Sequence, residues 1–180
     1  HDDLHHVGEH GAKFGSLKKT GIPIPDGFIL TSHAFNRFLE SNNLEMKAKH
    51  LLTTLNHNHP SSLSQISEII KKYFIDSDLP SDLKLDLYNS YKKLGGTLSD
   101  SHAKLILSPL STSNILNISN YSPKIKGEAS LIHKIKEYWA ASFTNFNIVH
   151  NHNNPTFTKS VIVQKAIEPD KSGKIYTIDP

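Results

Sequence analysis

The sequence predicts an α/β (α+β) protein in which a mixed sheet packs against a prominent helical layer. Two observations lead to this prediction. β-like runs occur near both ends of the chain, at residues 22–30 and 161–167. Between them, residues 44–97 and 128–143 carry apolar side chains at the spacing of amphipathic helices.

The first run, 22–30, is expected to be extended, because Pro23 and Pro25 exclude a helix and favour a strand at the solvent edge of a sheet. A glycine-containing loop and a short helix around 12–19 precede it.

A helix over 33–41 follows, for which Thr31 or Ser32 provides an N-cap. Its predicted buried face consists of four residues, Ala34, Phe35, Phe38 and Leu39.

The middle of the chain is predicted to be helical from 44 to 97. Pro80 starts a new helix within it, the glycines at 95 and 96 end that helix, and 57–64 is expected to be a loop. The apolar positions of the two later segments are Ile66, Ile69, Ile70, Tyr73 and Phe74, then Leu83, Leu87, Tyr88, Tyr91 and Leu94.

The C-terminal part begins with a short predicted strand at 104–107, which Pro109 interrupts, and a serine- and asparagine-rich loop at 111–123. The helix at 128–143 follows, with Trp139 in its buried stripe. The runs 160–167 and 170–180 then predict a β-hairpin. We expect 1–103 and 104–180 to be two parts of one domain that continues beyond 180.

Composition excludes several classes of protein. The chain has 20 basic and 17 acidic residues in scattered positions, a balance too even for a nucleic-acid partner. No apolar run approaches the roughly 18 residues that a membrane span needs. The absence of cysteine excludes disulfides, and no signal peptide is visible, so we expect a cytoplasmic protein.

Two motifs carry a resemblance to a known family. Residues 7–17 (VGEHGAKFGSL) and 21–31 (GIPIPDGFILT) resemble the opening V-G-G-K-G-A-x-L-G-E and G-I-P-V-P-x-G-F-x-x-T patterns of one nucleotide-binding domain. Residues 161–167 and 172–180 are similar to its later V-V-Q-K-M-V and S-G-V-x-F-T-x-D-P patterns. The domain that the chain resembles in these patterns is the N-terminal nucleotide-binding domain of the phosphoenolpyruvate synthase and pyruvate phosphate dikinase family.

The resemblance implies a partial ATP-grasp-like domain that binds ATP. In such proteins ATP phosphorylates a histidine on another domain, and the phosphoryl group then reaches pyruvate. The implied partners are therefore ATP, Mg²⁺ and downstream phosphohistidine and phosphoenolpyruvate/pyruvate-binding domains. The implied base contacts are Gln164 and the hinge Lys165, Ala166 and Ile167, while acidic Mg²⁺ ligands would lie beyond Pro180.

The phosphate side departs from the family pattern. The family's opening lysine falls on His10, and the arginine of its V-A-V-R-S-S-A-T strand falls on Ser108. The glycine-containing phosphate loop has no counterpart between Thr112 and Lys126. Phosphoryl transfer depends on such charge-assisted bonds, so we expect the isolated chain to be catalytically inactive.

Two alternatives of other classes stay open. One is a non-catalytic nucleotide-binding or regulatory module that retains the fold. The other is a histidine-rich metal-binding protein, because the chain has 12 histidines and several of them, His1, His5, His6 and His10, lie close together near its start.

Overall fold

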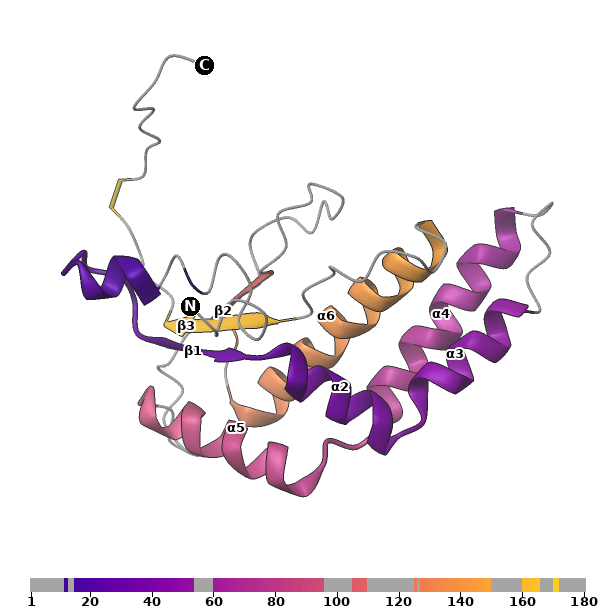
Figure 1. The fold of residues 1–180 in the computed structure, drawn as a ribbon, viewed down its shortest axis with the longest axis horizontal. Coiled ribbons are helices and arrows are strands. Elements are labelled where there is room, and N and C mark those ends of the chain that lie inside the picture. Colours follow the sequence, from indigo (N-terminus) through magenta and orange to yellow (C-terminus); the bar gives the residue numbers. More distant parts are fainter. Residues whose placement is uncertain are drawn as a thin grey trace, which may run out of the picture.

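The computed structural model describes residues 12, 15–53, 60–95, 105–109, 125, 127–149, 160–165 and 170–171 (Figure 1). The elements, in chain order, are β1 (Gly27–Leu30), α2 (Ser32–Ser41), α3 (Leu44–Thr53), α4 (Pro60–Asp76), α5 (Ser81–Lys93), β2 (Leu105–Pro109), α6 (Glu128–Val149) and β3 (Val161–Lys165).

The three described strands form one sheet in the order β1-β3-β2. The last strand in the sequence therefore lies between the first two, and both pairings are antiparallel. The β1–β3 register pairs Gly27 with Gln164, Phe28 with Val163, Ile29 with Ile162 and Leu30 with Val161. The sheet thus joins segments from opposite ends of the chain.

The prediction of an edge strand between 22 and 30 is confirmed for Gly27–Leu30. The expected mixed sheet is not found among the described strands. β1 and β2 run in the same direction, but β3 enters between them in the opposite direction, so neither of its neighbours is parallel to it.

The helical layer agrees with the prediction over most of its length. All four expected residues of α2 are buried, and α5 begins at Ser81 directly after Pro80. The predicted 57–64 loop is wrong from residue 60 onward, because α4 begins at Pro60. Proline suits the first position of a helix, where its missing N–H has no intrahelical partner to lose.

Of the apolar positions on α4, Ile66, Ile70 and Phe74 are buried, whereas Ile69 and Tyr73 are exposed. One further helix prediction needs correction. The last helix, α6, continues to Val149 rather than ending at 143, since no proline or glycine interrupts the sequence there.

Four aromatic rings form the centre of the core. Trp139 of α6 lies with its ring centroid 5.4 Å from that of Phe35 and 5.2 Å from that of Phe38, and both phenylalanines also contact Phe74 of α4. All four side chains are fully buried. The cluster therefore joins three helices, and α4 and α6 form the most extensive helix–helix contact.

The same core includes one face of the sheet. Leu30, Val161 and Val163 are buried in the cluster that contains the aromatic residues. Because side chains alternate between the two faces of a strand, the helical layer covers the face to which these residues point. In Figure 1, helices α2 to α6 accordingly lie on one side of the strands.

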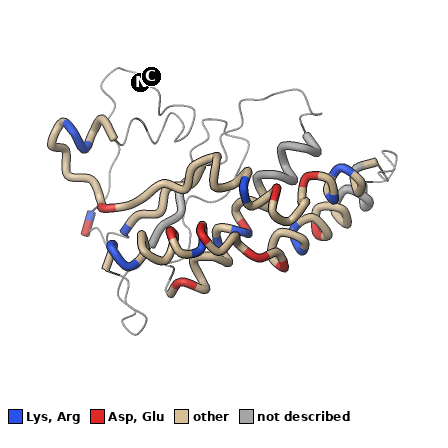
Figure 2. Tube along the Cα trace, turned by 60° about the horizontal axis from the view of Figure 1, so that its bottom comes forward, with Lys and Arg blue, Asp and Glu red and all other residues tan. Residues whose placement is uncertain are grey.

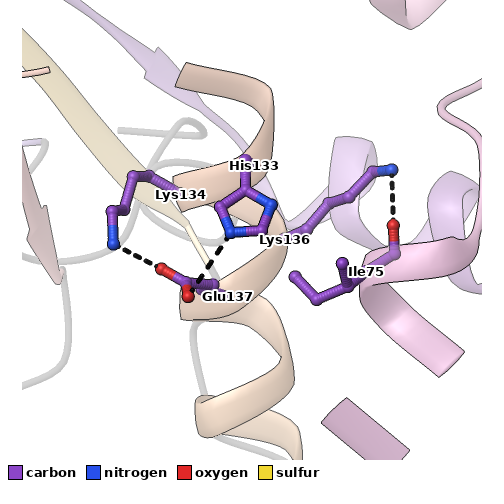
Figure 3. Close-up of polar contacts among 5 residues, drawn as sticks. All are labelled: Ile75, His133, Lys134, Lys136 and Glu137. Carbon is purple, nitrogen blue, oxygen red and sulfur yellow. Dashed lines mark hydrogen bonds and ion pairs between the residues drawn. The ribbon is translucent and has the colours of Figure 1, made fainter. Parts of the chain in front are cut away.

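Polar contacts fix the ends of α4 and α5. Lys136 of α6 donates from Nζ to the backbone oxygen of Ile75, 3.1 Å away, near the C-terminal end of α4 (Figure 3). Partial burial lowers the pKa of Lys136, although Asp78 and Asp76 oppose that effect. On the other side, the backbone N–H of Gly127 donates to the Tyr91 hydroxyl at 3.1 Å, which ties α5 to the start of α6.

Glu137 offers a test of surface electrostatics on α6. It accepts from Lys134 Nζ at 2.6 Å, and His133 Nε2 lies 3.5 Å from its other oxygen (Figure 3). The hydrogen bond from Lys134 is the main cause of a lowered pKa for Glu137. A lowered pKa in the folded state contributes stability above the usual value of 4.5, and this stability is lost as the pH falls through the folded-state pKa.

Glu137→Gln is therefore expected to lower the free energy of unfolding at pH 6 by about 0.2–1 kcal/mol, the range of exposed ion pairs. The difference from wild type should vanish at pH values below the folded-state pKa. Urea unfolding at several pH values measures both effects. Lys134→Gln should show the same loss of stability and the same pH dependence, because it removes the other partner of the ion pair. Parallel stability curves for wild type and Glu137→Gln would contradict the assignment.

Candidate functional site

The predicted site residues that the structure describes lie on β3 and β2. Gln164 and Lys165 end the central strand β3; Gln164 is partly buried and Lys165 is exposed. Backbone position 106 of β2 lies opposite Gln164, and Ser108 lies opposite Ile162. Gln164 and Ser108 therefore belong to the same small sheet.

Gln164 lies on the face of the sheet opposite the helical core. Val161 and Val163 point into the core, so Ile162 and Gln164 point the other way. Directly opposite residues of an antiparallel pair share a face, which places Gly27 beside Gln164 and Ile29 beside Ile162. Ile162 on this face is buried, and Gln164 is partly buried.

Gly27 allows a close approach of β1 to β3. A Cβ atom built on Gly27 would lie 2.6 Å from the backbone oxygen of Val163 and 2.8 Å from Cγ of Gln164. Both distances are too short for real side chains, so only glycine fits here without a shift of the strands.

Two lysines surround Asp26 at this end of the sheet. Lys18 Nζ lies 3.0 Å from Asp26 Oδ1, and the backbone N–H of Lys165 donates to the Asp26 backbone oxygen at 2.9 Å. The hydrogen bond from Lys18 and then its charge, followed by the charge of Lys165, lower the pKa of Asp26. Lys18 and Lys165 therefore both contribute positive charge near the Asp26 carboxylate, at the end of β3 that carries Gln164.

Elsewhere the charges are mixed. Figure 2 shows basic and acidic residues interspersed along the described helices. No helix of the described residues is long and apolar enough to cross a membrane.

The remaining site predictions lie outside the described residues. They are His10, Ala166 and Ile167, together with the histidines near the start and the second strand of the predicted hairpin at 172–180. Within the described part of the chain, no group of three His, Asp or Glu side chains is arranged to hold a metal ion.

Sequence reasoning gave no role to Lys18, Asp26 or Gly27. Asp26 and Gly27 belong to the motif at 21–31, but the motif alone does not show which strand they meet. A pairing between residues so far apart in the sequence has no local signal. The only available indication was the glycine within an otherwise β-like run, which is typical of a close backbone approach.

Comparison with known proteins identifies the family of the chain. The family model described as "Pyruvate phosphate dikinase, AMP/ATP-binding domain" matches residues 4–113 of the chain. Because the match covers more than half of the 180 residues, the chain belongs to this family. The matched range includes His10 and Ser108 but ends before β3.

Three curated relatives extend the similarity to β3. A phosphoenolpyruvate synthase of Aeropyrum pernix is 28% identical over 97% of this chain and 23% of its own length. A probable phosphoenolpyruvate synthase of Methanothermobacter thermautotrophicus is 24% identical over 99% of the chain and 28% of its own length. A rifampicin phosphotransferase of Bacillus subtilis is 26% identical over 97% of the chain and 21% of its own length. The chain thus spans about a quarter of the length of these relatives.

Proposed function

We propose that this chain is the ATP-binding part of a phosphotransferase of the phosphoenolpyruvate synthase and pyruvate phosphate dikinase type, acting in the cytoplasm. The observation that carries the proposal is the β1–β3 pairing. It sets the family motif containing Gly27 directly beside Gln164, on the sheet face opposite the helical core.

In this proposal the adenine base binds at the end of β3. The Gln164 amide offers one hydrogen-bond acceptor and two donors to the base, and the backbone of Lys165, Ala166 and Ile167 contacts its edge. Lys18 and Lys165 add positive charge near Asp26, at the same end of the sheet. The fold proposed for this arrangement is a partial ATP-grasp-like domain.

The two parts, 1–103 and 104–180, are proposed to form one domain. This agrees with a sheet in which β1 comes from the first part and β2 and β3 from the second. The sheet would come apart if the two parts separated.

The phosphate side is proposed to be degenerate. With His10 and Ser108 in place of lysine and arginine, two charge-assisted bonds to the phosphates weaken or disappear, each of which contributes about 1.5–3 kcal/mol. The chain would then bind ATP, while Mg²⁺ ligands and the histidine and pyruvate-binding domains of a complete phosphotransferase would come from elsewhere. If those domains are absent, the same ATP-binding part would be a non-catalytic nucleotide-binding module, which is the alternative function.

Calorimetric titration of the chain with ATP tests the proposal. Wild type should bind ATP saturably, and Gln164→Ala should weaken binding about two- to tenfold, the loss of one neutral hydrogen bond. Met46→Ala is a matched control, because Met46 is 69% exposed on α3 and belongs to no predicted site.

The outcomes separate the alternatives. Wild type that shows no ATP binding, or Gln164→Ala that binds as tightly as wild type, would contradict the proposed base contact. A parallel titration with Zn²⁺ tests the histidine-rich metal-binding alternative, since metal binding to histidine and carboxylate ligands releases protons. Zn²⁺ binding with proton release and no ATP binding would favour that alternative.

A further inference from the structure

Gly27 of β1 lies opposite Gln164 of β3, the residue proposed to contact the adenine base. Gly27 and Gln164 are directly opposite in the antiparallel register. The position that a Cβ of Gly27 would take lies 2.8 Å from Gln164 Cγ and 3.3 Å from Gln164 Cα. Carbon atoms pack comfortably at about 3.5–4.0 Å, so the Gln164 side chain already occupies the space that a larger residue at 27 would need.

The requirement for glycine at this position is spatial. The described glycines with positive φ are Gly21, Gly95 and Gly127, and Gly27 is not among them. An alanine would therefore meet no backbone strain at position 27. What it would meet is the Gln164 side chain and the Val163 backbone oxygen, 2.6 Å from its Cβ.

The neighbouring residue holds the same point of β3 in place. Asp26 accepts the backbone N–H of Lys165 at 2.9 Å, one residue beyond the Gly27–Gln164 pair. Lys18 in turn holds the Asp26 carboxylate at 3.0 Å. The segment 26–27 thus contacts both the backbone and the side chain at the end of β3 where the base is proposed to bind.

We propose that Gly27 is a positioning residue for the nucleotide site: having no side chain, it leaves room for that of Gln164 to lie against β1, and this sets where the Gln164 amide meets the base. The inference rests on the proposed base contact of Gln164. Gly27 itself touches no ligand in this account and acts only through Gln164.

A double-mutant cycle tests the inference by measuring the ATP dissociation constants of wild type, Gly27→Ala, Gln164→Ala and the double variant. Gly27→Ala should weaken ATP binding about as much as Gln164→Ala, two- to tenfold. In the Gln164→Ala background, Gly27→Ala should weaken ATP binding further by a smaller factor than in wild type, because residue 27 then has no Gln164 amide left to position and only its backbone contacts remain.

Ile29→Ala is the matched control for a general loss of sheet stability. Ile29 lies on the same face of β1, but it pairs with Ile162 and not with Gln164. It should lower the melting temperature while leaving the ATP dissociation constant unchanged at a temperature where the chain is folded. The NMR signal of the Gln164 side-chain amide should shift in Gly27→Ala and stay in place in Ile29→Ala.

Each outcome decides the matter. Equal ATP affinity of wild type and Gln164→Ala would overturn the base contact and this inference together. The inference alone would be overturned if Gln164→Ala weakened ATP binding and Gly27→Ala did not. It would also be overturned if the two losses of affinity added fully in the double variant. If Gly27→Ala does not fold but the double variant does, the steric role of the Gln164 side chain is supported. If the double variant does not fold either, glycine is required at position 27 because of the Val163 backbone oxygen, and the inference is overturned.

Discussion

Trp139→Ala is expected to lower the free energy of unfolding by about 3–5 kcal/mol, the cost of removing a large buried aromatic side chain. Trp139 is fully buried and contacts Phe35 and Phe38 of α2, which in turn pack on Phe74 of α4. Removing the indole leaves a cavity where three helices meet. Because that core also includes the inner face of the sheet, the loss should affect the whole chain.

Urea unfolding followed by circular dichroism measures this effect, with Trp139→Phe as the matched control. Phenylalanine keeps an aromatic ring in the cluster, so the control should lose clearly less stability than Trp139→Ala. Equal stability of wild type and Trp139→Ala would mean that the aromatic cluster is not the centre of the core.

Val163→Asp is expected to cost about 4 kcal/mol or more, because it places an unpaired carboxylate in the interior. Val163 is fully buried, and β3 lies between β1 and β2, so the new charge has no route to solvent along the sheet. The variant should also lose ATP binding, since the next residue is Gln164.

Val163→Asn separates the charge from the polarity of the new side chain. At neutral pH, Val163→Asn should be more stable than Val163→Asp. Burial raises the pKa of a carboxyl group, so the stability of Val163→Asp should increase as the pH falls toward that raised pKa. Thermal unfolding between pH 4 and 8 measures this trend. A Val163→Asp chain as stable as wild type at neutral pH would contradict the central position of β3.

Local patterns in the sequence predict the helical layer well. The apolar spacing of α2 gives its four buried residues, and Pro80 marks the start of α5. The incorrect predictions come from residues whose sequence pattern is compatible with two structures. Pro60 suits both a loop and the first position of a helix, and the amphipathic pattern of α4 did not show that Ile69 and Tyr73 lie at the edge of its buried face.

The sheet was predictable only in part. Pro23 and Pro25 predicted an extended run at 22–30, of which only Gly27–Leu30 is a strand. The insertion of β3 between β1 and β2 depends on contacts between distant segments, which leave no local pattern. Gln164 could be chosen from the resemblance alone. Its pairing with Gly27, and the presence of Lys18 and Asp26 beside it, required the structure. The binding roles of all the predicted site residues stay predictions: His10, Ser108, Gln164, Lys165, Ala166 and Ile167.

The central claim is that the β1–β3 end of the sheet forms one wall of an adenine-nucleotide site. Mapping backbone amide signals by NMR during an ATP titration tests it most directly. The account predicts saturable shifts at Gly27, Gln164 and Lys165, with little change along α4. Shifts confined to α4 and α5, or no saturable shift at the end of β3, would contradict it.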